Sequence, residues 1–281
     1  MNSPTPNDMA TGVGIETAFE ACPLCGTPGR EPVAEADCRK HPLWQPGLPQ
    51  TLRWVCCQGC LHVYRTAFFS PAGLQLLFSR AHEHQIIGNE IDEQRVQWAD
   101  AVRMIHRLLG APAWRGGEPS WLDVGCGSGG LVFTAAEFGF QAIGVDARQA
   151  AVDRIASLGY KAARGDLAEL EVSSPVDVIS LADVLEHVPF PREAIQRVHA
   201  ALKPGGALFV SCPNYDCAAW RAAEATGKNC YWGEIEHFHN FCRASLMRLL
   251  SQEGFEPVDY QVSRRYRMCM EVTAVKAGAK T

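Results

Sequence analysis

The sequence predicts an α/β protein with a doubly wound, mostly parallel sheet of seven strands whose last strand is antiparallel, and a small metal-binding module ahead of it. Three observations support this. Apolar runs alternate with helical patterns from residue 120 to residue 211, as in a parallel sheet with helices on both faces. A glycine-rich loop follows the first of these runs, and two Cys-x-x-Cys pairs precede them.

The cysteine pairs lie near the amino terminus, and the chain holds 12 Cys in 281 residues. The first 20 residues lack the basic start and apolar segment of a secretory signal. We therefore expect a reducing cytoplasm, where paired cysteines more often bind metal than form disulfides. Two knuckles that each present two thiolates give the closed tetrahedral site of structural Zn²⁺. The expected ligands are Cys22, Cys25, Cys57 and Cys60.

Other side chains compete for this ion. Cys56 is a rival of Cys57, which is preferred because it gives the Cys-x-x-Cys spacing to Cys60. Weaker alternative ligands are Cys38, His41 and His62. The remaining cysteines fit the description of buried, reduced side chains that behave as small hydrophobes.

A helical stretch joins this module to the sheet. Ser70 and Pro71 form a helix start of the Ser-cap and first-position-Pro type, followed by an apolar face over residues 72–78. His82 and His84 fall in a candidate lid segment. Residues 90–109 read as an amphipathic helix that packs on the sheet. Its apolar positions are Ile91, Val96, Val102, Ile105, Leu108 and Leu109.

The glycine-rich loop ends the first strand of the sheet. Residues 121–130 run from an apolar stretch through Asp123 into four glycines and a helix start. Glycine accepts positive φ and lets the backbone approach a ligand, and amides at a helix start carry partial positive charge. Asp146 ends the next apolar run, 23 residues after Asp123. That spacing is typical of a carboxylate that binds ribose hydroxyls in a nucleotide-binding βαβ unit.

The rest of the domain continues the alternation. Helices are predicted at 147–158, 192–202 and 243–252, and strands at 160–164, 176–182, 207–211, 256–263 and 268–275. Pro204 and the two glycines after it stop the second helix. The last two strands form a hairpin through residues 264–267. This cationic turn could contact an anionic group, but a solvated turn is the preferred interpretation.

Four acidic side chains come at or just past the ends of predicted strands. They are Asp123, Asp146, Asp166 and Asp183. The carboxyl ends of parallel strands meet at one edge of a sheet, where such folds bind ligands. We therefore expect these side chains to converge on one crevice. A nicotinamide or flavin dinucleotide is the competing ligand, but the glycine pattern is Gly-x-Gly-x-Gly and not Gly-x-Gly-x-x-Gly.

Four motifs of the sequence resemble those of class I S-adenosylmethionine-dependent methyltransferases. They are the glycine loop, Gly144-Val-Asp146, Leu185-Glu-His-Val188 and Leu202-Lys-Pro-Gly-Gly206. The resemblance implies a Rossmann-like fold over roughly residues 95–275. It further implies that Gly125, Gly127 and Gly129 wrap the methionine part of the cofactor and that Asp146 holds its ribose. Asp166 and Leu167 would meet the adenine, with Asp123 and Asp183 also at the cofactor.

A subset of these enzymes carries an amino-terminal zinc knuckle with four cysteine ligands, which the first part of this chain resembles. The same subset has a Glu-His-Leu-Tyr-His-Phe-Ser segment near its acceptor site. Here residues 231–241 resemble it at Glu236, His237 and Phe241, with His239 where Tyr is usual. His187, His237 and His239 are thus the candidate catalytic residues, since histidine titrates near neutral pH and suits general-base work. A packing role for each histidine is the alternative.

The expected domains are a tail at 1–19, a zinc-knuckle module at 20–66, lid and linker helices at 67–115 and a catalytic domain at 116–281. The formal net charge of −5 and the absence of a basic stripe argue against a nucleic-acid partner. No stretch is apolar enough to cross a membrane, and the oligomeric state stays open. The expected activity is methyl transfer to oxygen or carbon of a small-molecule or carrier-bound metabolite. The alternatives are an RNA or protein methyltransferase that docks through the zinc module, and a cofactor-binding protein without turnover.

Overall fold

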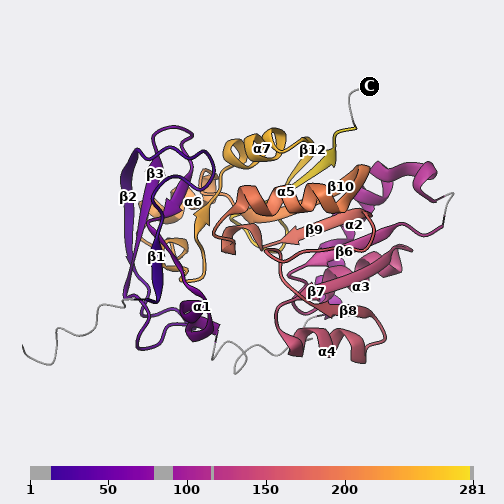
Figure 1. Ribbon diagram of the computed structural model, residues 1–281, viewed down its shortest axis with the longest axis horizontal. Coiled ribbons are helices and arrows are strands. Elements are labelled where there is room, and N and C mark those ends of the chain that lie inside the picture. The colour runs from indigo at the N-terminus through magenta and orange to yellow at the C-terminus, as the bar shows by residue number, and fades with distance from the viewer. Residues whose placement is uncertain (1–13, 79–90, 115–116, 279–281) are drawn as a thin grey trace, which may run out of the picture. The chain divides into compact units, whose positions relative to one another are not determined.

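Figure 1 shows the computed structural model, which describes residues 14–78, 91–114 and 117–278. The chain forms two compact units. Of the described residues, one unit holds 14–78 together with Ala223–Asn240, and the other holds 91–114, 117–222 and 241–278. The candidate lid with His82 and His84 lies outside the described residues.

The larger unit is built on a seven-stranded sheet. In spatial order its strands are β12 (Phe255–Val262), β13 (Cys269–Lys276), β10 (Leu202–Pro213), β9 (Val176–Ala182), β6 (Ser120–Val124), β7 (Gln141–Asp146) and β8 (Lys161–Arg164). Neighbouring strands from β10 to β8 are parallel, and β13 runs antiparallel to both β10 and β12. The predicted mostly parallel sheet with an antiparallel last strand is confirmed.

Helices connect these strands close to where the sequence predicts them. They are α3 (Gly130–Glu137), α4 (Gln149–Ser157), α5 (Pro191–Ala201) and α7 (Arg243–Gln252), with a 3-10 turn η2 (Leu185–His187) after β9. A further helix, α6 (Ala218–Ala225), was not predicted. It follows β10 and leads the chain from the larger unit into the smaller one.

Helix α2 (Ile91–Trp114) packs on the sheet as expected, but its buried face differs from the predicted one. Trp98, Val102 and Ile105 are buried in one apolar cluster with Trp121 of β6. Val96 and Leu108, both expected on this face, are 67% and 38% exposed. The prediction was wrong for these two residues because Trp98, seven residues after Ile91, sets the direction in which the helix faces the core.

The smaller unit contains a four-stranded antiparallel sheet. Its order is β11 (His239–Asn240), β4 (Val63–Arg65), β3 (Thr51–Cys57) and β2 (Arg30–Asp37). A second, short ribbon pairs β1 (Glu16–Ala18) with β5 (Ala67–Phe69), and α1 (Pro71–Phe78) follows it. The Oγ of Ser70 accepts a hydrogen bond from the amide of Gly73 at 3.2 Å, as expected for a helix cap.

Residues 223–240 belong to this smaller unit although they follow β10 in the chain. A 3-10 turn, η3 (Tyr231–Gly233), begins the stretch that contacts the sheet. The indole Nε1 of Trp54 donates to the carbonyl oxygen of Trp232 at 2.8 Å. Further along, β11 pairs with β4, with His239 opposite Tyr64. The division therefore differs from the expected boundaries, because backbone pairing between distant segments decides it.

A buried arginine holds this stretch in place. Arg65 is 2% exposed, and its Nη1 donates to the carbonyl oxygen of Ile235 at 2.7 Å. Its Nη2 forms an ion pair with Glu16, and its guanidinium lies 4.9 Å from the ring centroid of Phe69 and 5.4 Å from that of Phe238. A buried charge must be paired and hydrogen-bonded to be tolerated, and Arg65 meets both conditions.

Within the ranges that the structure describes, no helix is both long enough and apolar enough to span a membrane.

The substitution Arg65→Ala should lower the free energy of unfolding by about 1–3 kcal/mol, because it leaves the carbonyl oxygen of Ile235 without its donor and the half-buried Glu16 without its ion pair. Urea unfolding followed by tryptophan fluorescence measures it. Arg53→Ala is the matched control, since Arg53 pairs with Glu35 and the two side chains are 66% and 62% exposed. An exposed pair contributes less than about 1 kcal/mol. Equal losses in the two variants would contradict the role of Arg65.

Candidate functional sites

The glycine loop, residues 125–130, joins β6 to α3 and has left-handed backbone at three positions. The φ angles are 72° at Gly125, 54° at Gly127 and 88° at Gly129. A Cβ added at Gly129 would lie 2.6 Å from a ring carbon of Phe133, so no side chain fits there. At Gly127 the nearest atom would be 3.7 Å away, so the backbone remains open to a ligand.

Asp146 lies at the carboxyl end of β7 and bonds directly to this loop. The amide of Gly127 donates to its Oδ2 at 2.9 Å. The amide and Nε of Arg148 each donate to its Oδ1 at 2.9 Å. Burial alone would raise the pKa of Asp146, but the hydrogen bonds and charge of Arg148 outweigh it and lower the pKa below its usual value. Asp146 is thus an ionised carboxylate held beside the glycine loop.

Asp123, on β6, is a second acid at this edge and is only 2% exposed. Its Oδ1 accepts a hydrogen bond from Ser180 Oγ at 2.6 Å. The Ser180 Oγ in turn accepts a hydrogen bond from Trp121 Nε1 at 2.8 Å. Burial raises the pKa of Asp123 to about 7, against the opposing effects of Ser180 and Arg265. The carboxyl group is therefore balanced between its neutral and charged forms near neutral pH.

Asp183 directly follows β9 and has φ 56°, an unusual left-handed conformation for a residue with a side chain. Ser211 of β10 holds it from two sides: the Oγ donates to Oδ1 at 2.8 Å, and the carbonyl oxygen accepts from the Asp183 amide at 2.9 Å. Nη2 of Arg265 donates to Oδ2 at 2.7 Å. Such strained residues persist only where their surroundings hold them, and they cluster at ligand sites.

A cavity of about 320 Å³ lies beside Asp123 and the glycine loop, and neither Asp146 nor Asp183 belongs to its lining. Its walls come from the end of β6, the glycine loop, α2 and the turn between β12 and β13. The lining residues are Gln94, Gln97, Trp98, Asp123, Gly125, Cys126, Gly127, Ser128, Gly130, Leu131, Ala182, Arg265 and Tyr266. Asp123, Gly125 and Gly127 of the predicted set therefore share one cavity, and Asp146 is bonded to its wall through Gly127.

Asp166 and Leu167 follow β8, one strand beyond β7. Asp166 is exposed, and its Oδ1 accepts a hydrogen bond from the amide of Glu169 at 2.9 Å. Leu167 is 4% exposed. Both residues lie on the β7 side of the sheet, where Asp146 also lies, and neither belongs to the lining of the cavity.

The three candidate catalytic histidines fall in different units. His187 ends the turn η2 in the larger unit, and its amide donates to the carbonyl oxygen of Val184 at 3.0 Å. His237 and His239 belong to the smaller unit. His237 is 7% exposed, and its ring centroid lies 6.3 Å from that of Tyr231.

His239 is completely buried within the smaller unit. Its Nδ1 lies 3.1 Å from Nε2 of His62, which is also fully buried. Burial, and then the nearby His239, lower the pKa of His62 well below its usual value, so it is neutral. This geometry favours a structural role for His239, as a partner that satisfies a second buried ring.

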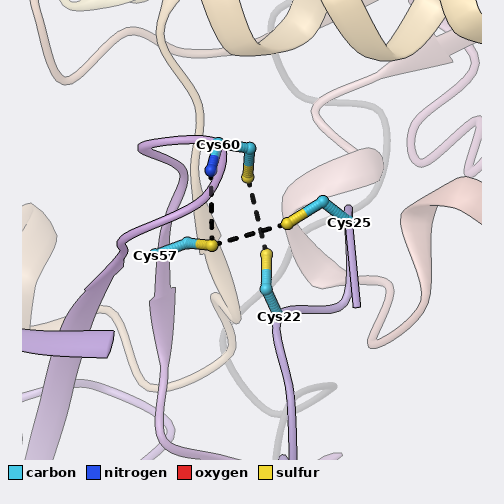
Figure 2. A group of neighbouring side chains, drawn as sticks. All are labelled: Cys22, Cys25, Cys57 and Cys60. Atoms are coloured by element: carbon cyan, nitrogen blue, oxygen red, sulfur yellow. Dashed lines mark hydrogen bonds between the residues drawn. The ribbon is translucent and has the colours of Figure 1, made fainter. Parts of the chain in front are cut away.

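Four cysteines of the smaller unit converge on one point (Figure 2). The Sγ atoms of Cys22 and Cys60 are 3.6 Å apart, and those of Cys25 and Cys57 are 3.5 Å apart. All four lie within 4.8 Å of one another. A tetrahedral Zn–S distance of about 2.3 Å places sulfurs about 3.8 Å apart, so the arrangement fits such an ion.

The knuckle geometry supports the same interpretation. The amides of Gly59 and Cys60 donate to Cys57 Sγ at 3.3 and 3.5 Å. Burial raises the pKa of the Cys57 thiol, and these two hydrogen bonds oppose that effect. The hydrogen bond between Cys22 and Cys60 lowers the pKa of the Cys60 thiol to about 5 and raises the pKa of the Cys22 thiol above its usual value. Thiolates are the form that binds metal.

The alternative ligands have other partners in the structure. Cys56 Sγ contacts the carbonyl oxygen of Cys57 at 3.8 Å, and Cys57 is the member of this pair that joins the cluster. Cys38 Sγ donates to the carbonyl oxygen of Pro49 at 3.0 Å. His41 Nε2 lies at hydrogen-bond distance, 2.9 Å, from a carboxylate oxygen of Glu234, and His62 faces His239.

Sequence reasoning missed three residues of the cavity region. Arg148 follows the predicted ribose carboxylate by two positions, so its proximity was a usable signal. Trp98 matches the helical spacing of Val102 and Ile105. The cationic turn at residues 264–267 indicates that an arginine there can contact an anion, but which arginine faces the cavity depends on how the hairpin turn folds.

Comparison with known proteins identifies a methyltransferase domain over most of the larger unit. A family model described as a methyltransferase domain matches residues 92–260. The chain is similar to ubiquinone biosynthesis O-methyltransferases of Idiomarina loihiensis (35% identical over 107 residues) and Caulobacter vibrioides (34% over 101). These stretches cover 35% and 33% of this chain and 44% and 40% of the relatives. The chain thus matches less than half the length of these curated relatives.

Solved structures share the fold. The 1,6-didemethyltoxoflavin-N1-methyltransferase of Burkholderia thailandensis, solved with 1,6-didemethyltoxoflavin and S-adenosylhomocysteine, superposes with a TM-score of 0.56 at 19% identity, covering 78% of this chain and 97% of that one. Magnesium protoporphyrin IX methyltransferase of Synechocystis, with bound S-adenosylhomocysteine, gives 0.51 at 18% identity, covering 74% and 95%. These similarities establish a Rossmann-like methyltransferase fold.

Proposed function

The chain belongs to the family of methyltransferase domains, and we propose that it transfers a methyl group from S-adenosylmethionine to an oxygen of a small-molecule metabolite. The observation that carries this proposal is the Asp146 carboxylate, bonded to the Gly127 amide at the end of β7. This is the place at which a Rossmann-like fold binds a ribose. The similarity to two O-methyltransferases supports oxygen as the acceptor atom.

S-adenosylmethionine, when bound, supplies an electrophilic methyl group on a sulfonium. In the proposal, Asp146 accepts hydrogen bonds from both ribose hydroxyls, and Arg148 keeps its carboxylate ionised. The open backbone at Gly127 lets the ligand approach the loop. Asp166 and Leu167 contact the adenine from the end of β8, next to β7.

An acceptor hydroxyl must also lose its proton as its oxygen is methylated. His187 follows β9 in the unit that holds the cavity, so we assign it the role of general base. His237 is a second candidate, held in the smaller unit. Much of the rate can still come from alignment of the two reactants, which needs no base.

For the smaller unit we propose a structural Zn²⁺ bound by Cys22, Cys25, Cys57 and Cys60. The sulfur separations support it, and four thiolates leave no open coordination position for chemistry. The ion would fix the two knuckles and, through β3 and β4, the sheet that pairs with β11.

The substitution Asp146→Asn should weaken binding of S-adenosylhomocysteine about 10- to 100-fold, because hydrogen bonds to a charged group are lost. Calorimetric titration measures the dissociation constant. Asp153→Asn is the control: Asp153 lies on α4 and contacts Gln149 at the surface. An unchanged affinity in the Asp146 variant would contradict the proposal that Asp146 binds the ribose hydroxyls.

The substitution His187→Gln should lower kcat by about 100-fold or more, since a general base contributes at least that much, and should change S-adenosylhomocysteine affinity little. Product formed from S-adenosylmethionine with a phenolic acceptor gives kcat. Reduced ligand affinity with unchanged turnover at saturation would show instead that His187 packs against the ligand.

The substitution Cys60→Ser should release zinc, measured as metal per chain by atomic emission, and should destabilise the smaller unit. Cys56→Ser is the matched control, since it changes the neighbouring knuckle cysteine outside the cluster and should keep one zinc per chain. Full metal content in the Cys60 variant would mean that other side chains hold the ion.

A further inference from the structure

The turn between β12 and β13 carries two adjacent arginines with opposite surroundings. The side chain of Arg264 is 74% exposed and contacts Asp100 on the surface, whereas that of Arg265 is 12% exposed and lines the cavity. The turn is closed by a hydrogen bond from the Arg265 amide to Ser263 Oγ at 3.2 Å and by one from the Cys269 amide to the Tyr266 carbonyl oxygen at 2.9 Å. The predicted solvated turn is thus correct for Arg264 and wrong for Arg265.

Aromatic rings fix the plane of the Arg265 guanidinium. Its Cζ lies 3.7 Å from the ring centroid of Trp98 and 5.0 Å from that of Tyr266. Arginine stacks in this way by combining cation–π attraction with planar contact, and stacking leaves the N–H groups at its edge free to bond. The guanidinium is therefore oriented before any ligand arrives.

Only part of the hydrogen-bonding capacity of Arg265 is used. Its Nη2 donates to Asp183 Oδ2 at 2.7 Å and to Ser211 Oγ at 3.3 Å. Its Nε is buried, and no acceptor within the described residues bonds to it. A guanidinium carries five donors in a fork that matches a carboxylate, and a buried donor without a partner is a costly feature that calls for an explanation. A ligand oxygen in the cavity is that explanation.

The charges around the cavity favour a ligand that is itself charged. Asp183 and Ser211 position Arg265 on one side, and Asp123 supplies a carboxyl group on the same lining. The two reactants of the proposed function offer two sources of a carboxylate. One is the amino-acid end of the methyl donor, and the other is an acidic methyl acceptor.

We propose that Arg265 is the carboxylate-binding residue of this cavity, presented by Trp98 and Asp183, and that it recognises a carboxylate of one of the two reactants. The proposal rests on the methyltransferase function proposed above and adds to it a residue that favours a negatively charged ligand group.

The donor arm of the test compares S-adenosylhomocysteine with 5′-methylthioadenosine, which keeps the nucleoside and sulfur but has no carboxylate. Calorimetry on the full chain gives both dissociation constants for the wild type, Arg265→Gln, Arg265→Lys and the surface control Arg264→Gln. If the methyl donor carries the carboxylate that Arg265 binds, Arg265→Gln raises the dissociation constant of S-adenosylhomocysteine at least about 10-fold. The dissociation constant of methylthioadenosine stays within about 3-fold of the wild-type value. Arg265→Lys restores part of the loss, and Arg264→Gln changes neither value.

The acceptor arm uses protein saturated with S-adenosylhomocysteine and compares 4-hydroxybenzoate with its neutral analogue 4-hydroxybenzamide. If the methyl acceptor carries the carboxylate that Arg265 binds, the wild type binds 4-hydroxybenzoate at least about 10-fold more tightly than 4-hydroxybenzamide, and Arg265→Gln removes this preference. The same two variants, Arg264→Gln and Arg265→Lys, serve as control and partial rescue.

The proposal is overturned if neither arm shows a preference for carboxylate that depends on Arg265. It is also overturned if Arg265→Gln weakens S-adenosylhomocysteine and methylthioadenosine equally, because Arg265 would then act by shaping the cavity. Failure of the proposed function has a separate signature: the wild type would bind neither nucleoside.

Discussion

Parallel pairing of β7, β6, β9 and β10 is the constraint on which the candidate site depends. It brings the carboxyl ends of these strands to one edge of the sheet, so that Asp146, Asp123, Asp183 and Ser211 lie on neighbouring strands. Each of these side chains then acts on a neighbour: Asp146 bonds to the glycine loop, and Ser211 holds Asp183. A change in the order of strands would separate all of these contacts at once.

The electrostatics of this edge follow from burial combined with partners. Three carboxyl groups lie close together at this edge, and each is stabilised by a different partner. Asp146 has Arg148, Asp183 has Arg265, and Asp123 has the hydroxyl of Ser180, with a raised pKa as the result of its burial. Ligand groups of either charge can therefore find a complementary partner along the same edge.

Much of this edge could be predicted from the sequence because its signals are local. The glycines and Asp146 stand at fixed spacings after apolar runs, and short-range geometry determines their placement. The four cysteines are equally local within each knuckle. The placement of Arg265 depends instead on contacts between α2 and a distant hairpin, which no spacing encodes, although the helical spacing of Trp98 does predict its buried face. The composition of residues 231–241 and their resemblance to an acceptor segment do not signal the backbone pairing of Asn240 with Val63.

That pairing has a consequence for the order in which the chain can fold during synthesis. The cysteine knuckles and strands β2, β3 and β4 leave the ribosome early, whereas β11 follows only after the central strands of the larger unit have been made. The outer edge of β4 must therefore wait with its backbone groups unpaired while the larger unit begins to form. Arg65 likewise gains its bond to Ile235 only at that late stage. The smaller unit therefore begins before the larger one but is completed only after strands β6 to β10 of the larger unit have been made, with β12 and β13 still to follow. The folding of the two units thus overlaps in time.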